Sequence, residues 1–157
     1  MLNKNSPNAN SFVRDVTLFV LASASIVIAV ATAGCWYGEV YVSDSGCTPR
    51  GVCPYGSDAP RNFYYQPENV VVVQPNAGAS IILHELAHMW QGRLCPRDDI
   101  ALTCWLDTPE GRDFPNTPYP WSIGEGKIED MAWVFAAHYL GWELDSARSQ
   151  WAERWLP

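Results

Sequence analysis

The sequence contains no run of lysine or arginine, and its 17 acidic residues outnumber its 10 basic ones, giving a formal net charge of −7. A protein that binds nucleic acid neutralises phosphates with clustered cations. We therefore expect no nucleic-acid partner, and the acidic balance favours neutral or basic substrates. Internal repeats and low-complexity tracts are also missing, and a chain of 157 residues is the size of one domain.

Charge is absent from residues 16–34, VTLFVLASASIVIAVATAG, which follow Lys4 and Arg14. This pattern resembles a secretory signal or a single membrane anchor. Ala31-Thr32-Ala33 fits ordinary signal cleavage, whereas Thr32-Ala33-Gly34-Cys35 resembles a bacterial lipoprotein site. We expect residues 1–35 to be a signal peptide, a lipoprotein signal or a membrane anchor. In each case residues 36–157 form a domain outside the cytoplasm, secreted or anchored to the cell membrane.

Cysteine is scarce and odd in number. The five cysteines are Cys35, Cys47, Cys53, Cys95 and Cys104. If Cys35 carries lipid, the other four form two near pairs, 47 with 53 and 95 with 104, each able to close a short loop in an oxidising compartment. Other pairings stay open at this point.

The domain after Cys35 has the element order of a small α+β fold. Residues 36–43, WYGEVYVS, and residues 69–75, NVVVVQP, have the composition of strands, and Pro75 stops the second. Helix-start residues at 76–80 and a stop at Gly92 predict the first helix. Further helices are predicted over 126–140, capped by Gly141, and over 145–155.

Two loops complete this outline. Residues 44–62 are rich in Gly, Pro, Ser and Asp and contain Cys47 and Cys53, which predicts a loop held by a disulfide. Residues 93–124 contain five prolines and predict an irregular excursion with one short helical turn. A loop of that length in a small domain usually has a function or is disordered.

Only three histidines occur, and two lie in the pentapeptide His84-Glu85-Leu86-Ala87-His88. On a helix of about 3.6 residues per turn, residues four apart project side by side, so both imidazoles can reach one metal ion. Glu85 lies beside them, where it can take a proton from a water molecule. The H-E-x-x-H pattern of zinc hydrolases combines these features. We predict one zinc ion held by His84 and His88, with Glu85 as catalytic base.

A catalytic zinc site needs a third protein ligand. The extended motif H-E-x-x-H-x-x-G-x-x-H is excluded, because Gln91 stands where its glycine belongs and Leu94 where its third histidine belongs. His138 is a weak candidate, since nine residues separate it from Glu129 and place the two on opposite sides of one helix. A glutamate on the second helix is the better solution.

The pentapeptide and the second helix together resemble the gluzincin group of zinc metallopeptidases, in particular its minimal single-domain members. In many of these the second helix contains E-x-x-A-x-x-F-A, which Glu129, Ala132, Phe135 and Ala136 match. The resemblance implies a zincin-like fold, in which a short antiparallel or mixed sheet packs on the motif helix and a second ligand-bearing helix. It implies that His84, His88 and Glu129 hold zinc.

Glu125 is an alternative third ligand. In the segment from Trp121 to Gly126 it resembles the W-x-x-E-G segment of aminopeptidase-type gluzincins, less one residue of spacing. Glu129 would then be an acid that orients a histidine. With Glu129 as the ligand, Asp130 is the predicted orienting partner.

Two further features of the cleft follow from the resemblance. In zincins a strand just before the motif helix pairs with extended substrate, and residues 69–75 are placed either to do this or to be an interior strand. Tyr119 and Tyr139 are candidates for polarising the attacked carbonyl.

The sequence therefore predicts zinc-dependent, metalloendopeptidase-like hydrolysis of a peptide or protein substrate outside the cytoplasm. A second hypothesis is a membrane-tethered interaction module that binds zinc without turnover. A third is a disulfide-stapled domain with no metal. Glu85 distinguishes the first two, because a purely structural zinc site makes no use of it.

Overall fold

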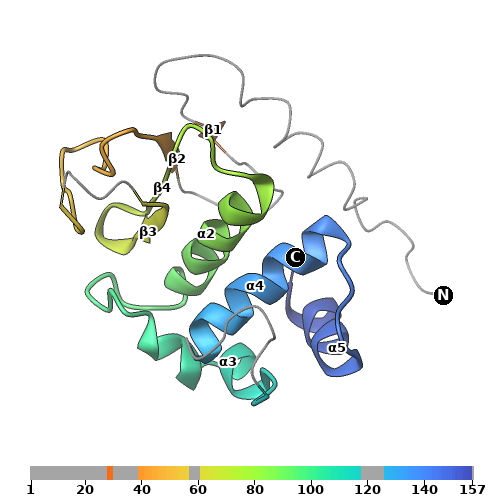
Figure 1. Ribbon diagram of the computed structural model, residues 1–157. Helices are drawn as coiled ribbons and strands as arrows, with labels where there is room; N and C mark the ends of the chain where they lie inside the picture. Colours follow the sequence, from red (N-terminus) through yellow and green to blue (C-terminus); the bar gives the residue numbers. More distant parts are fainter. Residues whose placement is uncertain (1–27, 30–38, 57–60, 118–125, 157) are drawn as a thin grey trace.

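The computed structural model describes residues 28–29, 39–56, 61–117 and 126–156. Helix α2 (Ala79–Gly92) lies at its centre, between a small mixed sheet on one side and helix α4 (Lys127–Leu140) on the other (Figure 1). Helix α5 (Ser146–Trp155) packs against α4. The predicted α+β class is confirmed.

The sheet has the strand order β1-β2-β4-β3. Its strands are β1 (Ile28–Ala29), β2 (Glu39–Val42), β3 (Phe63–Tyr65) and β4 (Val70–Val73). β2 and β4 are parallel, whereas β3 is antiparallel to β4 and β1 to β2. All four valines of β4 are buried, as their branched side chains favour in an interior strand.

Two of these strands correspond to predicted ones, and β3 was missed. β4 lies within the predicted strand 69–75, and β2 lies within 36–43, of which residues 36–38 are outside the described part. β3 has only three residues and is followed at once by a 3-10 helix, η1 (Gln66–Glu68). So short a strand gives no alternating pattern long enough to detect.

Helix ends agree with the sequence except at Gly92. Gly141 adopts the left-handed conformation that caps α4, with φ of 69°, and the Asp145 side chain accepts a hydrogen bond from the Arg148 N–H at the start of α5. Gly92 is instead the last residue of α2 and does not cap it. A Cβ at Gly92 would lie 2.6 Å from the Tyr64 ring, so its small size serves the contact between α2 and β3.

The excursion after α2 is more ordered than predicted. It contains a 3-10 helix, η2 (Thr103–Asp107), and a short helix α3 (Pro109–Asp113), where one helical turn was expected. Both near pairings of cysteine occur, Cys47 with Cys53 and Cys95 with Cys104. These disulfides are consistent with an extracellular location.

The predicted targeting segment, residues 1–35, lies outside the described residues except for β1. Among the helices of the described part, none is both long and apolar enough to cross a membrane.

Aromatic rings pack the segment that follows α2 against helices α2 and α5. Phe114 lies edge-on to Trp151 of α5 at 4.9 Å between ring centroids and to Trp105 of η2 at 5.9 Å. Trp151 also lies edge-on to Trp90 of α2 at 6.3 Å. All four rings are almost fully buried, so this cluster holds the excursion, α2 and α5 in one core.

We expect Phe114→Ala to lower the free energy of unfolding by about 3–4 kcal/mol, because it leaves a cavity inside this cluster. The measurement is urea denaturation followed by tryptophan fluorescence. Leu106→Ala, at a position in η2 that is 37% exposed, is the control and should cost less than about 1 kcal/mol. Equal losses in the two variants would contradict the assignment of the cluster to the core.

Candidate metal centre

His84 and His88 project side by side from consecutive turns of α2, as their spacing predicts. Their rings are edge-on at 4.8 Å between centroids, and their Nε2 atoms are 3.2 Å apart. Both side chains are buried. Two imidazoles on one side of the helix thus direct the same ring nitrogen to one point.

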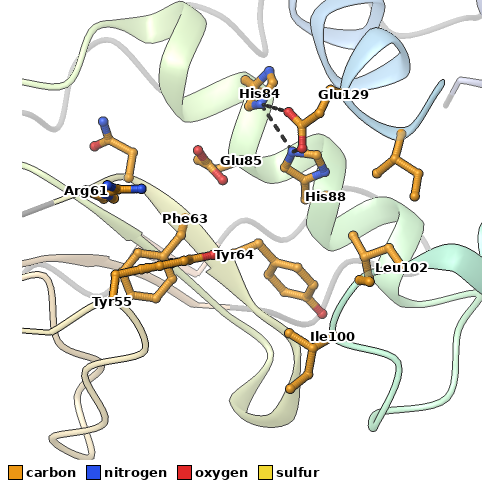
Figure 2. A pocket seen from close by; sticks show the side chains of 13 residues that line it. Tyr55, Arg61, Phe63, Tyr64, His84, Glu85, His88, Ile100, Leu102 and Glu129 are labelled. Carbon is orange, nitrogen blue, oxygen red and sulfur yellow. Dashed lines mark hydrogen bonds and ion pairs between the residues drawn. The ribbon is translucent and has the colours of Figure 1, made fainter. Parts of the chain in front are cut away.

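Glu129 reaches that point from α4. Its carboxylate oxygens lie 3.0 Å from His84 Nε2 and 3.3 Å from His88 Nε2 (Figure 2). The close approach of α4 to α2 is made through fully buried small residues, among them Ala132 and Ala136, as the sequence suggested. Glu129 remains 34% exposed, so the point where the three side chains meet is open to solvent on one side.

This donor set fits a metal ion. His84, His88 and Glu129 form a group that could hold one. Zinc–ligand distances of about 2.0–2.1 Å in a tetrahedral arrangement place the ligand atoms roughly 3.3 Å from one another. The two Nε2 atoms are 3.2 Å apart, and each lies close to a different oxygen of Glu129, His84 Nε2 at 3.0 Å from Oε2 and His88 Nε2 at 3.3 Å from Oε1, so each of these separations is close to that value.

Gln91 orients His88, a role that sequence reasoning missed. The Gln91 Nε2 donates to the Ile128 carbonyl at 3.1 Å, which leaves its Oε1 to accept from His88 Nδ1 at 2.8 Å. His88 Nδ1 therefore donates to Gln91, which leaves Nε2, the nitrogen that faces His84 and Glu129, as the atom that would bind a metal ion. Gln91 is fully buried. The signal was present, since Gln91 lies three residues after His88 on a helix.

Trp133 of α4 covers the other imidazole. Its ring lies 4.5 Å from the His84 ring between centroids, tilted by 51°. The His84 Nδ1 is buried and has no hydrogen-bond partner in the described part of the chain. Asp130, the predicted orienting partner, is buried beside Glu129, and its role stays a prediction.

Glu85 lies beside the three and not among them (Figure 2). The Tyr64 backbone N–H donates to its carboxylate, which ties it to β3. Burial raises the pKa of Glu85, and the neighbouring His88 and His84 only partly oppose this effect. A carboxyl with a raised pKa binds a proton more readily than an ordinary glutamate, as a general base requires.

The opposite shift occurs at Glu129. Burial alone would raise the pKa of this carboxyl, but hydrogen bonds from His84 and His88 outweigh burial and hold the pKa well below its usual range. For His88, burial alone would lower the pKa, and the hydrogen bond and charge of Glu129 raise it. The two glutamates therefore differ in chemistry: Glu129 stays anionic, as a metal ligand must, and Glu85 takes up a proton more readily than an ordinary glutamate.

A cleft of about 650 Å³ opens onto these residues. Its walls come from elements far apart in the sequence: Tyr55 follows the Cys47–Cys53 disulfide, Tyr64 belongs to β3, and Ile100 lies between Cys95 and Cys104. Two loops closed by disulfides and one strand thus surround His84, Glu85, His88 and Glu129.

Other predicted residues lie elsewhere. Glu125 and Tyr119 are outside the described residues. Tyr139 packs against Phe135 at 4.7 Å between ring centroids and does not line the cleft. His138 is half-buried, and burial lowers its pKa. It does not belong to the group of possible metal ligands.

The strand 69–75 is an interior strand, because β4 lies between β2 and β3. The alternative, that this strand pairs with substrate, is wrong, since both of its edges are already paired. The edge strand next to β4 is β3, and its residues Phe63 and Tyr64 line the cleft.

A second group of potential ligands does not form a metal site. Cys95, Asp99 and Cys104 lie close together, but the two sulfurs are joined as a disulfide. Asp99 accepts hydrogen bonds from the Cys104 N–H at 2.6 Å and from the Thr103 hydroxyl at 3.2 Å. Its carboxylate therefore shapes the start of η2.

Comparison with known proteins finds no matching family model, no matching curated protein and no matching solved structure. The functional argument accordingly rests on the chemistry of the site itself.

We expect Gln91→Leu to weaken zinc binding about 10- to 100-fold, because His88 Nδ1 loses its acceptor and the ring its fixed orientation. The measurement is competition with a chromophoric chelator on protein shown to be folded by circular dichroism. Gln66→Leu is the matched control. Gln66 is also buried, and its Nε2 donates hydrogen bonds to the carbonyls of Gly92 and Pro96. Replacing it should therefore lower stability but leave zinc affinity unchanged. Equal affinity losses in both variants would count against Gln91 as an orienting residue.

Proposed function

We propose that this chain is a zinc-dependent peptidase that acts outside the cytoplasm, with His84, His88 and Glu129 as the zinc ligands. The observation that carries the proposal is the meeting of these three side chains at one point beside Glu85, open to a cleft. When bound, zinc supplies Lewis acidity, which polarises a peptide carbonyl and lowers the pKa of water toward about 7.

Glu85 acts as the general base in this proposal. It faces the cleft, its pKa is raised by burial, and the Tyr64 N–H fixes its carboxylate. It takes a proton from the attacking water and then delivers it to the leaving nitrogen as the peptide bond breaks. Gln91 holds the His88 imidazole in place during both steps.

The edge of β3 is the element that we propose to align the substrate. In an antiparallel strand the N–H and C=O of one residue point to the same side. Because the Tyr64 N–H points to Glu85 and away from β4, its carbonyl also faces the cleft, where an extended peptide can pair with it. An extended peptide or protein segment is therefore the proposed substrate.

Location outside the cytoplasm is supported by the Cys47–Cys53 and Cys95–Cys104 disulfides. The apolar run at residues 16–34 would export the domain or tether it to the membrane.

The third ligand is tested by the zinc content of the purified protein, measured by elemental analysis. We expect about one zinc per chain in the wild type and in Glu125→Ala, and loss of zinc in Glu129→Ala, because the Glu129 carboxylate lies against both imidazoles. Retention in Glu129→Ala with loss in Glu125→Ala would assign the ligand to Glu125. A folded wild type that takes up no zinc would refute the proposal.

The role of Glu85 is tested by Glu85→Gln, which keeps the shape of the side chain and removes its basicity. We expect this variant to keep its zinc and to lose about a hundredfold or more in kcat/KM on a fluorescent peptide substrate. Glu110→Gln, in α3, is a control that should leave the rate unchanged. If zinc-loaded wild type and Glu85→Gln are equally inactive on a broad peptide set, the zinc-binding interaction module is the better description.

A further inference from the structure

Arg61 places a permanent positive charge in the cleft. Among the described residues that line it, Arg61 is the only lysine or arginine, and the carboxyl groups are those of Glu85 and Glu129. Within the part of the chain that the structure describes, no carboxylate lies within ion-pair distance of Arg61. Its charge is therefore available to something that enters the cleft.

Two packed aromatic rings, Tyr55 and Phe63, support the position of this guanidinium. The Arg61 guanidinium carbon lies 5.5 Å from the centre of the Tyr55 ring, a cation–π contact. Tyr55 packs edge-on against the buried Phe63 of β3 at 5.4 Å. It also lies in a turn closed by the Gly56 N–H to Cys53 carbonyl hydrogen bond, next to the Cys47–Cys53 disulfide. Arg61 therefore packs on Tyr55, and Tyr55 is anchored to the edge strand β3.

The two ends of the cleft differ in polarity. Figure 2 shows Arg61 and Tyr55 on the Glu85 side, and Ile100 and Leu102 on the opposite side. Ile100 is 63% exposed, so this far end presents apolar surface to the cleft. A substrate lying along the cleft therefore meets a cation at one end and apolar side chains at the other.

We infer that the cleft selects peptides that carry a carboxylate on the Arg61 side of the bond to be cleaved, an inference that rests on the proposed peptidase function. The planar guanidinium matches a carboxylate in geometry and charge. On this side of the cleft (Figure 2) Glu85 by itself would disfavour a second carboxylate, and the positive charge of Arg61 offsets it. The net charge of −7 favours basic substrates at long range, but salt screens such interactions beyond about 8–10 Å, so the nearby cation decides at contact.

The carboxylate has two chemical sources, an Asp or Glu side chain and the free C-terminus of the peptide. Binding experiments separate them. The protein is the zinc-loaded full chain carrying Glu85→Gln, so that ligands are not consumed. The probes are short synthetic peptides with one Glu/Gln exchange, placed N-terminal or C-terminal to a central apolar residue. Each peptide is made with a free and with an amidated C-terminus.

We expect calorimetry to show about fivefold tighter binding for Glu than for Gln at one of the two positions only, as for a partly exposed, charge-assisted pair. Adding Arg61→Gln should abolish this preference, and Arg61→Glu should transfer it to a Lys-containing peptide. Arg50→Gln is the matched control, because Arg50 is an exposed arginine that does not line the cleft. If Glu and Gln peptides bind equally but amidation weakens binding in the wild-type Arg61 background and not in Arg61→Gln, the carboxylate is the C-terminus.

Equal binding of all probes, absence of binding, or a preference that survives Arg61→Gln would overturn the inference. Its failure is distinguishable from failure of the proposed function. Glu85-dependent cleavage without an Arg61-dependent preference would keep the peptidase and reject the carboxylate site. An Arg61-dependent preference in a protein whose wild type cleaves no peptide would keep the carboxylate site and reject the peptidase.

Discussion

The approach of α4 to α2 through buried alanines brings the Glu129 carboxylate against the imidazoles of His84 and His88. Side chains larger than Ala132 and Ala136 would separate the two helices and withdraw the carboxylate from the ring nitrogens. The sheet, the excursion and α5 all pack around this helix pair. The geometry of the site is therefore fixed by core packing and not by a flexible loop.

Burying two imidazoles and a glutamate in the central helix of a small domain is costly unless each polar group has a partner. The structure supplies most of these partners: Gln91 for His88, the Tyr64 N–H for Glu85, and Glu129 for both Nε2 atoms. Such a concentration of polar groups weakens a core that serves stability alone. It is the arrangement expected where a chain keeps reactive side chains in fixed positions for chemistry.

The cleft, the proposed substrate surface, is built with little secondary structure. Its walls are one edge strand and two loops, each loop shortened by a disulfide. A disulfide restricts a loop that has too little buried surface to hold its own shape. The ring of Tyr55 beneath Arg61 and the apolar end at Ile100 both depend on such loops. The two disulfides and the edge strand β3 therefore determine how polarity changes along the cleft.

The sequence by itself determined what depends on neighbours along the chain. Helical periodicity placed His84 beside His88, and glycine marked the end of α4 at Gly141. Short spacing only suggested the cysteine pairs, and the structure chose them among the possible pairings. Only the tertiary structure decided which residues meet across elements. It brought Glu129 to the histidines, paired Gln91 with the Ile128 carbonyl, and made β3 the edge of the sheet in place of the valine-rich strand.

The physical reason for this division is distance. Spacing along a helix is set by backbone geometry, which is the same in every protein. Whether Glu129 or Glu125 faces the histidines depends on the rotation and separation of two packed helices, and these follow from the shapes of many side chains in the core. The position of Arg61 over Tyr55 likewise requires a loop, a disulfide and a strand to be in place together.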